Sequence, residues 1–181
     1  IAENPELLLP VMVCLDGFTL SHTLENVQTL PDSLVKKFVG VRQFPFVTNH
    51  EGKTVPFKLD PKNPVTIGPL DLYDYYFEHK RQQEEAMRIA PKIIKQVHEE
   101  YAKISGRRYG DGLIEPYCLE DAETAIVCVG STSGTVKTIV NELRSKGMKV
   151  GLLRLRTFRP LPVKEITKAL ENVKAIAVMD R

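Results

Sequence analysis

The chain has 181 residues, 43% of them hydrophobic and 27% charged, a composition that is ordinary for globular protein and excludes disorder and collagen. Its longest apolar runs fall far short of the roughly 20 residues that a membrane-spanning helix needs. With 25 basic and 23 acidic residues the net charge is only +2, so neither nucleic acid nor a membrane is expected as a partner.

Residues 1–47 begin with an apolar run, Leu7 to Leu15, that ends at Asp16-Gly17. This pattern predicts a buried strand that enters a turn. A strand so apolar needs neighbours on both sides, as in a parallel sheet, and the residues that follow do not provide them. We interpret 1–47 as the C-terminal part of a domain whose other strands lie outside this chain.

Residues 48–70 are rich in proline, which holds the chain extended and prevents a regular helix. We expect a linker arm that packs along a surface, rather than a solvated tether, because five apolar residues are spread along it: Val55, Phe57, Leu59, Val65 and Ile67.

Residues 71–105 form a helical connector in this interpretation, since apolar side chains recur every three or four positions. Pro91 interrupts the pattern and predicts a kink or two consecutive helices.

Residues 106–181 open with a glycine-rich loop and then alternate between strand and helix patterns. This order predicts a parallel α/β sheet with helices on its faces, and three strands are too few to complete one. The expected elements are strands at 123–129, 150–156 and 175–179, a turn at 130–134, a helix at 135–146 that stops at Gly147, and a helix opened by Pro162.

One candidate site is the small-residue turn between the first of these strands and its helix. Backbone N–H groups at a helix N-terminus bind phosphates and carboxylates, although the spacing matches neither GxGxxG nor GxxxxGK[ST]. The alternative is a plain turn in which a Ser or Thr caps the helix. The residues are Gly130, Ser131, Thr132, Ser133 and Gly134.

A second candidate lies where the strand ending at Leu15 enters its turn, the end at which open α/β sheets place ligands. Asp16, Gly17, Ser21 and His22 stand there, and an Asp, a Ser and a His suggest a triad. A triad is defined by geometry rather than by proximity in sequence. In the alternative interpretation these residues are structural: Asp16 caps the turn, Ser21 starts a helix and His22 makes a hydrogen bond.

Arg154, Arg156 and Arg159 form a third candidate site, because arginine grips carboxylates and phosphates through two parallel hydrogen bonds. An intersubunit salt-bridge network is an equal alternative. Nucleotide binding of the NADP kind has weak support without the glycine fingerprint.

The three cysteines, Cys14, Cys118 and Cys128, form no CxxC pair, and their odd number argues against a disulfide framework. Neither a metal site nor a local iron–sulfur site is predicted. The N-terminal residues carry no basic region ahead of an apolar one, so we expect no signal peptide and a reducing, cytoplasmic compartment.

Several runs in the same order resemble the alpha subunit of the pyruvate:ferredoxin oxidoreductases, within the thiamine-diphosphate-dependent 2-oxoacid:ferredoxin oxidoreductase family. They are VMVCLDGFTLSHT, the stretch from GRRYGDGL to TFRPLP, and the ending AIAVMDR. The resemblance covers nearly the whole chain. It implies a pyrimidine-binding-like domain up to residue 47, and a truncated transketolase C-terminal-like (Rossmann-like) domain over 106–181.

The resemblance also implies an activity for the complete protein, with pyruvate as the expected oxoacid. Thiamine diphosphate with magnesium decarboxylates the oxoacid, [4Fe-4S] clusters carry electrons to ferredoxin, and coenzyme A takes the acyl group. Beta, gamma and delta subunits are the implied partners. This segment alone is expected to bind none of these cofactors, to serve assembly and to frame the active site.

Asp16, Gly17, Ser21 and His22 match the family's DGF..SH motif and are expected nearest to the active centre. The glutamate that activates the cofactor lies upstream of that motif in the family and is not on this chain. Two alternatives remain open: a non-catalytic subunit-interaction module and a nucleotide-binding α/β domain.

Overall fold

The structure is a computed structural model that describes residues 1–18, 20–68 and 70–180. Thr19 of the DGF..SH motif, Pro69 of the arm and Arg181 at the end of the chain lie outside the described residues.

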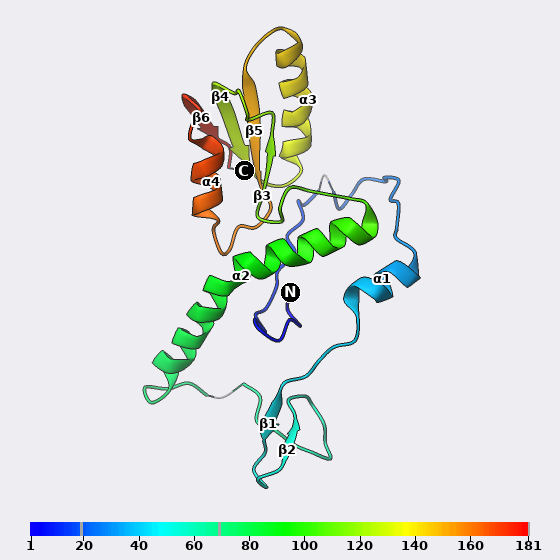
Figure 1. Cartoon of the computed structure of the whole chain (residues 1–181), viewed down its shortest axis with the longest axis vertical. Coiled ribbons are helices and arrows are strands. Elements are labelled where there is room, and N and C mark those ends of the chain that lie inside the picture. The colour runs from blue at the N-terminus through cyan, green and yellow to red at the C-terminus, as the bar shows by residue number, and fades with distance from the viewer. Residues whose placement is uncertain (19, 69, 181) are drawn as a thin grey trace.

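A four-stranded sheet organises the C-terminal half of the described chain (Figure 1). Strands β4, β5 and β6 are parallel, as the sequence predicts, whereas β3 pairs antiparallel with β5 and makes the sheet mixed. The three expected strands are parallel, and β3 is an additional antiparallel strand that the sequence pattern did not predict. In spatial order the strands are β3 (Ile114–Tyr117), β5 (Val150–Leu155), β4 (Thr124–Cys128) and β6 (Ala175–Val178).

The loop before β3 explains the extra strand. The Asp111 carboxylate accepts the backbone N–H groups of Leu113 and Ile114, both at 2.9 Å, and so reverses the chain direction. Gly110 takes φ +69°, and a Cβ there would lie 2.0 Å from the Ile114 carbonyl oxygen, so only glycine fits this turn.

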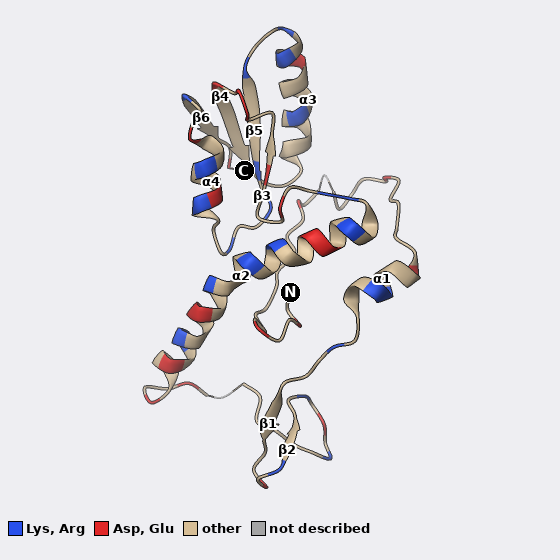
Figure 2. Cartoon of the chain, viewed as in Figure 1, with Lys and Arg blue, Asp and Glu red and all other residues tan. Residues whose placement is uncertain are grey.

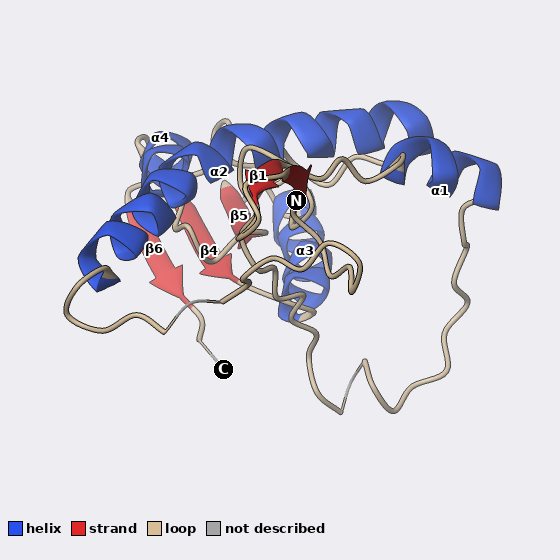
Figure 3. Cartoon of the chain, turned by 90° about the horizontal axis from the view of Figure 1, so that it is seen from below, coloured by secondary structure: helices blue, strands red, loops and turns tan. Residues whose placement is uncertain are grey.

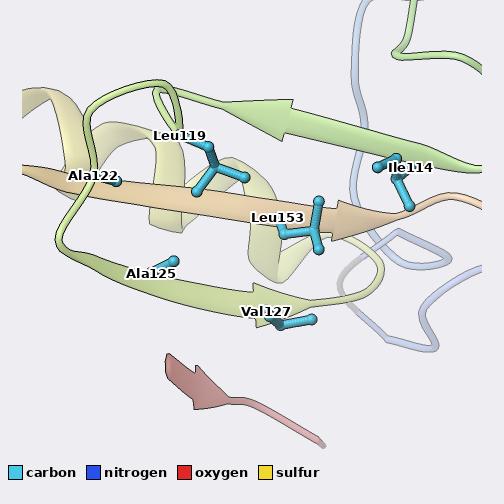
Figure 4. Close-up of a cluster of buried hydrophobic side chains, with 6 residues drawn as sticks. All are labelled: Ile114, Leu119, Ala122, Ala125, Val127 and Leu153. Atoms are coloured by element: carbon cyan, nitrogen blue, oxygen red, sulfur yellow. The ribbon is translucent and has the colours of Figure 1, made fainter. Parts of the chain in front are cut away.

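Two helices cover opposite faces of the sheet: α3 (Thr132–Ser145) and α4 (Val163–Leu170) (Figures 1 and 3). Because side chains alternate along a strand, the core divides into two clusters. Cys128 and Leu152 pack with Val136 and Val140 of α3. The cluster on the α4 face is drawn in Figure 4 and comprises Ile114, Leu119, Ala122, Ala125, Val127 and Leu153.

Helix α2 (Tyr76–Ser105) is one unbroken helix of 30 residues with Pro91 inside it. It changes direction near its middle (Figure 1), as expected for an interior proline, so the kink rather than two helices is observed. Ala90 and Ile93 of α2 pack against Leu7 from the start of the chain. Gly106 ends the helix in the left-handed conformation.

The buried strand expected over Leu7–Leu15 is not formed. Leu7 is buried, but Met12 and Val13 are 88% and 83% exposed, and the described residues supply no neighbouring strand. An extended segment without a partner leaves its backbone groups to water. The regular element observed between residues 1 and 45 is a short helix, α1 (Asp32–Val39).

The arm folds on itself through a hairpin formed by β1 (Phe46–Thr48) and β2 (Thr54–Pro56), so the expected boundary at residue 47 falls inside β1. Val55 is buried, while Leu59 and Ile67 are 91% and 54% exposed. The expectation that all five apolar side chains of the arm pack along a surface is wrong for these two.

Candidate functional site

Two of the three candidate sites meet at the carboxyl end of β4. The Oδ2 atom of Asp16 accepts the backbone N–H of Ser131 at 2.5 Å, across 115 positions of sequence. Asp16 is half-buried there, whereas Gly17, Ser21 and His22 are exposed. A Cβ added at Gly17 would meet no atom within 4 Å, so no close approach requires glycine at that position.

Ser21 and His22 lie side by side but do not form a triad with Asp16. The Ser21 hydroxyl contacts Nδ1 of His22 at 2.7 Å, and the ring of Phe18 stacks on His22 with centroids 5.1 Å apart. The Asp16 carboxylate meets the Ser131 amide instead. A triad needs the carboxylate to orient the imidazole that activates the hydroxyl.

The Gly130–Gly134 turn is stabilised from within. Gly130 takes φ +67°, and the Ser133 hydroxyl donates to the Gly130 carbonyl at 2.7 Å. The helix begins at Thr132, three residues earlier than expected, and the Ser131 side chain makes no capping hydrogen bond. We expected a Ser or Thr side chain to cap the helix, but the Asp16 carboxylate accepts the Ser131 N–H at this position instead.

Two of the arginines share one carboxylate that the sequence interpretation missed. Glu115 of β3 lies 3.5 Å from Arg154 and 4.0 Å from Arg156, and it also forms an ion pair with Lys137 of α3. Burial, together with the charge of Arg154, lowers the pKa of Arg156. Arg159 is exposed beyond β5 and joins no ion pair described with Glu115.

The cluster joins basic side chains from α3 and from the end of β5 to one carboxylate, and both elements carry residues coloured blue in Figure 2. The side-chain Nε of Arg154 is buried without a hydrogen-bond partner in the described structure. A single charged residue between apolar ones, as in the stretch LIEPY, is the sequence signal that could have pointed to Glu115.

Two hollows lie away from these positions. One, of about 410 Å³, runs along α2 and is lined by paired charges that include Lys95 and Asp111. The other, of about 500 Å³, lies within the arm. Within the described residues no group of three or more His, Cys, Asp or Glu side chains could hold a metal ion, and no helix is long and apolar enough to cross a bilayer.

Comparison of the sequence with known protein families identifies the family to which the chain belongs. Residues 1–99, more than half of the chain, match the family model described as "Pyruvate flavodoxin/ferredoxin oxidoreductase, thiamine diP-bdg". The chain belongs to this family. A second model, "Pyruvate:ferredoxin oxidoreductase core domain II", matches residues 122–181.

Curated relatives align with the whole chain. "Pyruvate synthase subunit PorA" of Thermotoga maritima is 48% identical over 100% of this chain and 43% of its own length. The subunit of the same name from Methanocaldococcus jannaschii is 45% identical, with 44% of its length covered. The alpha subunit of NADH-dependent phenylglyoxylate dehydrogenase from Aromatoleum evansii is 37% identical, with 42% of its length covered. The chain therefore spans less than half of the length of these relatives.

Proposed function

We propose that the chain is part of the alpha subunit of a 2-oxoacid:ferredoxin oxidoreductase that converts pyruvate, coenzyme A and oxidised ferredoxin into acetyl-coenzyme A, carbon dioxide and reduced ferredoxin. The observation that carries this proposal is the alignment of the entire chain with subunits named for pyruvate synthase at 48% and 45% identity. Pyruvate is preferred to an aromatic oxoacid because the relatives at 48%, 45% and 40% identity are all named for pyruvate synthase, whereas the phenylglyoxylate relative stands at 37%, a level close to that of other pyruvate synthase subunits.

Within that enzyme this segment serves assembly and frames the active site. We assign residues 1–47 to the end of a pyrimidine-binding-like domain, 48–70 to an arm and 71–105 to a helical connector. Residues 106–181 belong to a transketolase C-terminal-like domain. The sheet with α3 and α4 on its two faces supports the last assignment.

The cofactors belong to other parts of the complete protein. Thiamine diphosphate and magnesium need a diphosphate cradle and oxygen ligands, but the Ser131 amide is engaged by Asp16 and the described residues offer no metal cluster. In this arrangement the turn is not free to accept a diphosphate. We further propose that the complete protein assembles with beta, gamma and delta subunits in the cytoplasm. The [4Fe-4S] clusters and the coenzyme A site lie on other parts of that complex.

The nucleotide-binding alternative loses support from the same contact, since a phosphate would have to displace the Asp16 carboxylate from the turn. The interaction-module alternative concerns residues 106–181 in particular. It is compatible with the oxidoreductase, because a domain without catalytic groups can still hold subunits together.

The proposal is tested on the full-length protein purified with its natural partners. We expect co-purifying subunits, a brown iron–sulfur absorption spectrum, and reduction of a viologen dye that requires both pyruvate and coenzyme A. Phenylglyoxylate and 2-oxoglutarate serve as substrate controls and should reduce the dye more slowly. A colourless, solitary protein without thiamine diphosphate would refute the oxidoreductase, and a preference for another oxoacid would refute the substrate.

A further inference from the structure

Helix α3 lacks an N-terminal cap of its own. The first N–H groups of a helix have no partner within it, and a negative charge near them is stabilising. Ser131 at the N-cap makes no capping hydrogen bond, and the first turn contains no acidic residue. The Ser133 hydroxyl donates to the Gly130 carbonyl, so its hydrogen is directed into the turn.

Asp16 supplies both the missing acceptor and the missing charge. Its Oδ2 accepts the Ser131 N–H at 2.5 Å. A Cβ at Gly130 would lie 2.6 Å from Oδ1 of Asp16 and 2.9 Å from Oδ2. The turn therefore needs glycine at 130 for a second reason besides its positive φ, since only glycine lets the carboxylate approach so closely.

Asp16 is also the point at which its own segment is attached. Among the described residues from 11 to 29, every residue except Asp16 is exposed. The neighbouring side chains Leu15 and Phe18 are 76% and 78% exposed. Packing therefore contributes little to the position of this segment, and the hydrogen bond from Ser131 to Asp16 ties it to the sheet.

We propose that the Gly130–Gly134 turn is an intramolecular binding site for the Asp16 carboxylate, and that this contact holds residues 16–18 and 20–22 against the sheet. Asp16 acts as an anchor that fixes where Ser21 and His22 lie relative to β4 and α3. This inference does not depend on the reaction that the complete protein catalyses.

The test uses hydrogen–deuterium exchange of the full-length protein in its complex, read in peptides that cover 11–25 and 130–135. Asp16→Asn removes the charge and keeps the shape of the side chain. Ser131→Pro removes the N–H donor, and the φ of −69° at Ser131 is one that proline adopts without strain. We expect each variant to accelerate exchange in both peptides by about tenfold or more, since hydrogen bonds to charged groups are of that strength.

The double variant Asp16→Asn/Ser131→Pro should exchange no faster than the more affected single variant, because both changes act on one interaction: the first removes its charge and the second its donor. Asp32→Asn is the matched control, since Asp32 lies in the first turn of α1, away from the Asp16 contact, and exchange in the two peptides should not change.

Gly130→Ala is compared with Gly147→Ala. Both glycines have positive φ, but a Cβ at Gly147 meets no atom within 4 Å, so Gly130→Ala should loosen the 11–25 peptide and Gly147→Ala should not.

Three results would overturn the inference. Unchanged exchange in both single variants would show that the Asp16–Ser131 contact does not hold the segment around Asp16 against the sheet. Faster exchange in the 130–135 peptide alone would show that Asp16 only caps α3 and does not fix the position of its own segment. Additive effects in the double variant would mean that the two groups act separately.

Discussion

Glu115 is the shared counterion of three basic side chains on the α3 face of the sheet, Lys137, Arg154 and Arg156. Its side chain is 13% exposed, whereas the three cations are 25–30% exposed. When a buried counterion is removed, its partner cations repel one another, and water does not solvate them enough to compensate. The carboxylate therefore matters more to the sheet than any one of the cations.

We expect Glu115→Gln to destabilise β3 and β5 by about 2–3 kcal/mol. This cost is at or below the smallest costs of breaking a fully buried ion pair, because the three cations retain some water. The free energy of opening, from hydrogen exchange of the β3 and β5 amides in the full-length protein, measures the effect. Glu142→Gln is the control, because Glu142 pairs with Lys146 on the exposed surface of α3 and should contribute less than about 0.5 kcal/mol. Equal effects of the two changes would contradict this account.

At the scale of elements, Lys95 joins α2 to α4. Its Nζ lies 2.7 Å from Glu165 of α4 and 3.3 Å from Asp111 in the loop before β3. The hydrogen bond with Glu165 raises the pKa of Lys95, and the same bond lowers the pKa of Glu165. Burial opposes ionisation of Asp111, but hydrogen bonds from the Ile114 and Leu113 amides, together with the Lys95 ammonium, lower the pKa of Asp111 as well.

These shifts predict a pH-dependent bond between the two helices. The lowered pKa of Glu165 gives stability that is present above the pKa of the unfolded state and is lost as the pH falls through the folded value. The raised pKa of Lys95 gives stability that is present below the unfolded pKa of lysine and is lost as the pH rises through the folded value. The contribution is therefore greatest near neutral pH.

We expect Lys95→Met to cost about 0.5–1 kcal/mol near neutral pH, since the side chains of Lys95 and Glu165 are 40% and 25% exposed and solvent screens the pair. The cost should shrink toward acidic pH as Glu165 becomes protonated. Hydrogen exchange of the α4 amides in the full-length protein at several pH values measures it. Lys92→Met, at an exposed position of the same helix, should show neither the cost nor the pH dependence.

Local sequence patterns predicted the elements whose partners are near in sequence. Strands β4, β5 and β6 lie within one residue of their expected bounds, and the stop at Gly147 is confirmed by its positive φ. Strand β3 was missed because Pro116 lies inside it, and proline is found in strands almost only at sheet edges.

Contacts between distant residues carried no local signal. Nothing within the DGF..SH motif or the GSTSG turn indicates that Asp16 caps α3, because the two are separated by 115 positions. The same limit applies to Glu115, whose three cationic partners come from α3, β5 and the residue after β5. The apolar run Leu7–Leu15 predicted a buried strand, and this prediction is wrong for most of the run, because Met12, Val13 and Leu15 are exposed. An apolar run does not specify which strands would cover it.

At the scale of the whole molecule, β6 is an unprotected edge strand. It pairs with β4 on one side, its four residues are all exposed, and the described residues place no strand on its other side. Open edges with apolar side chains pair with other chains. The exposed residues Met12, Val13 and Leu24 add further apolar surface.

The 181-residue chain in isolation should therefore self-associate at micromolar concentrations, as measured by sedimentation velocity over a dilution series. A lysine on an edge strand opposes pairing because the incoming strand would have to desolvate its charge. We expect Ile176→Lys, on β6, to weaken the association. Ile139→Lys is the matched control, because Ile139 lies on α3 and is 46% exposed against 49% for Ile176, so the two variants add the same charge at equal exposure. Equal weakening by both would assign the effect to net charge rather than to the strand edge, and a concentration-independent monomer would contradict the prediction.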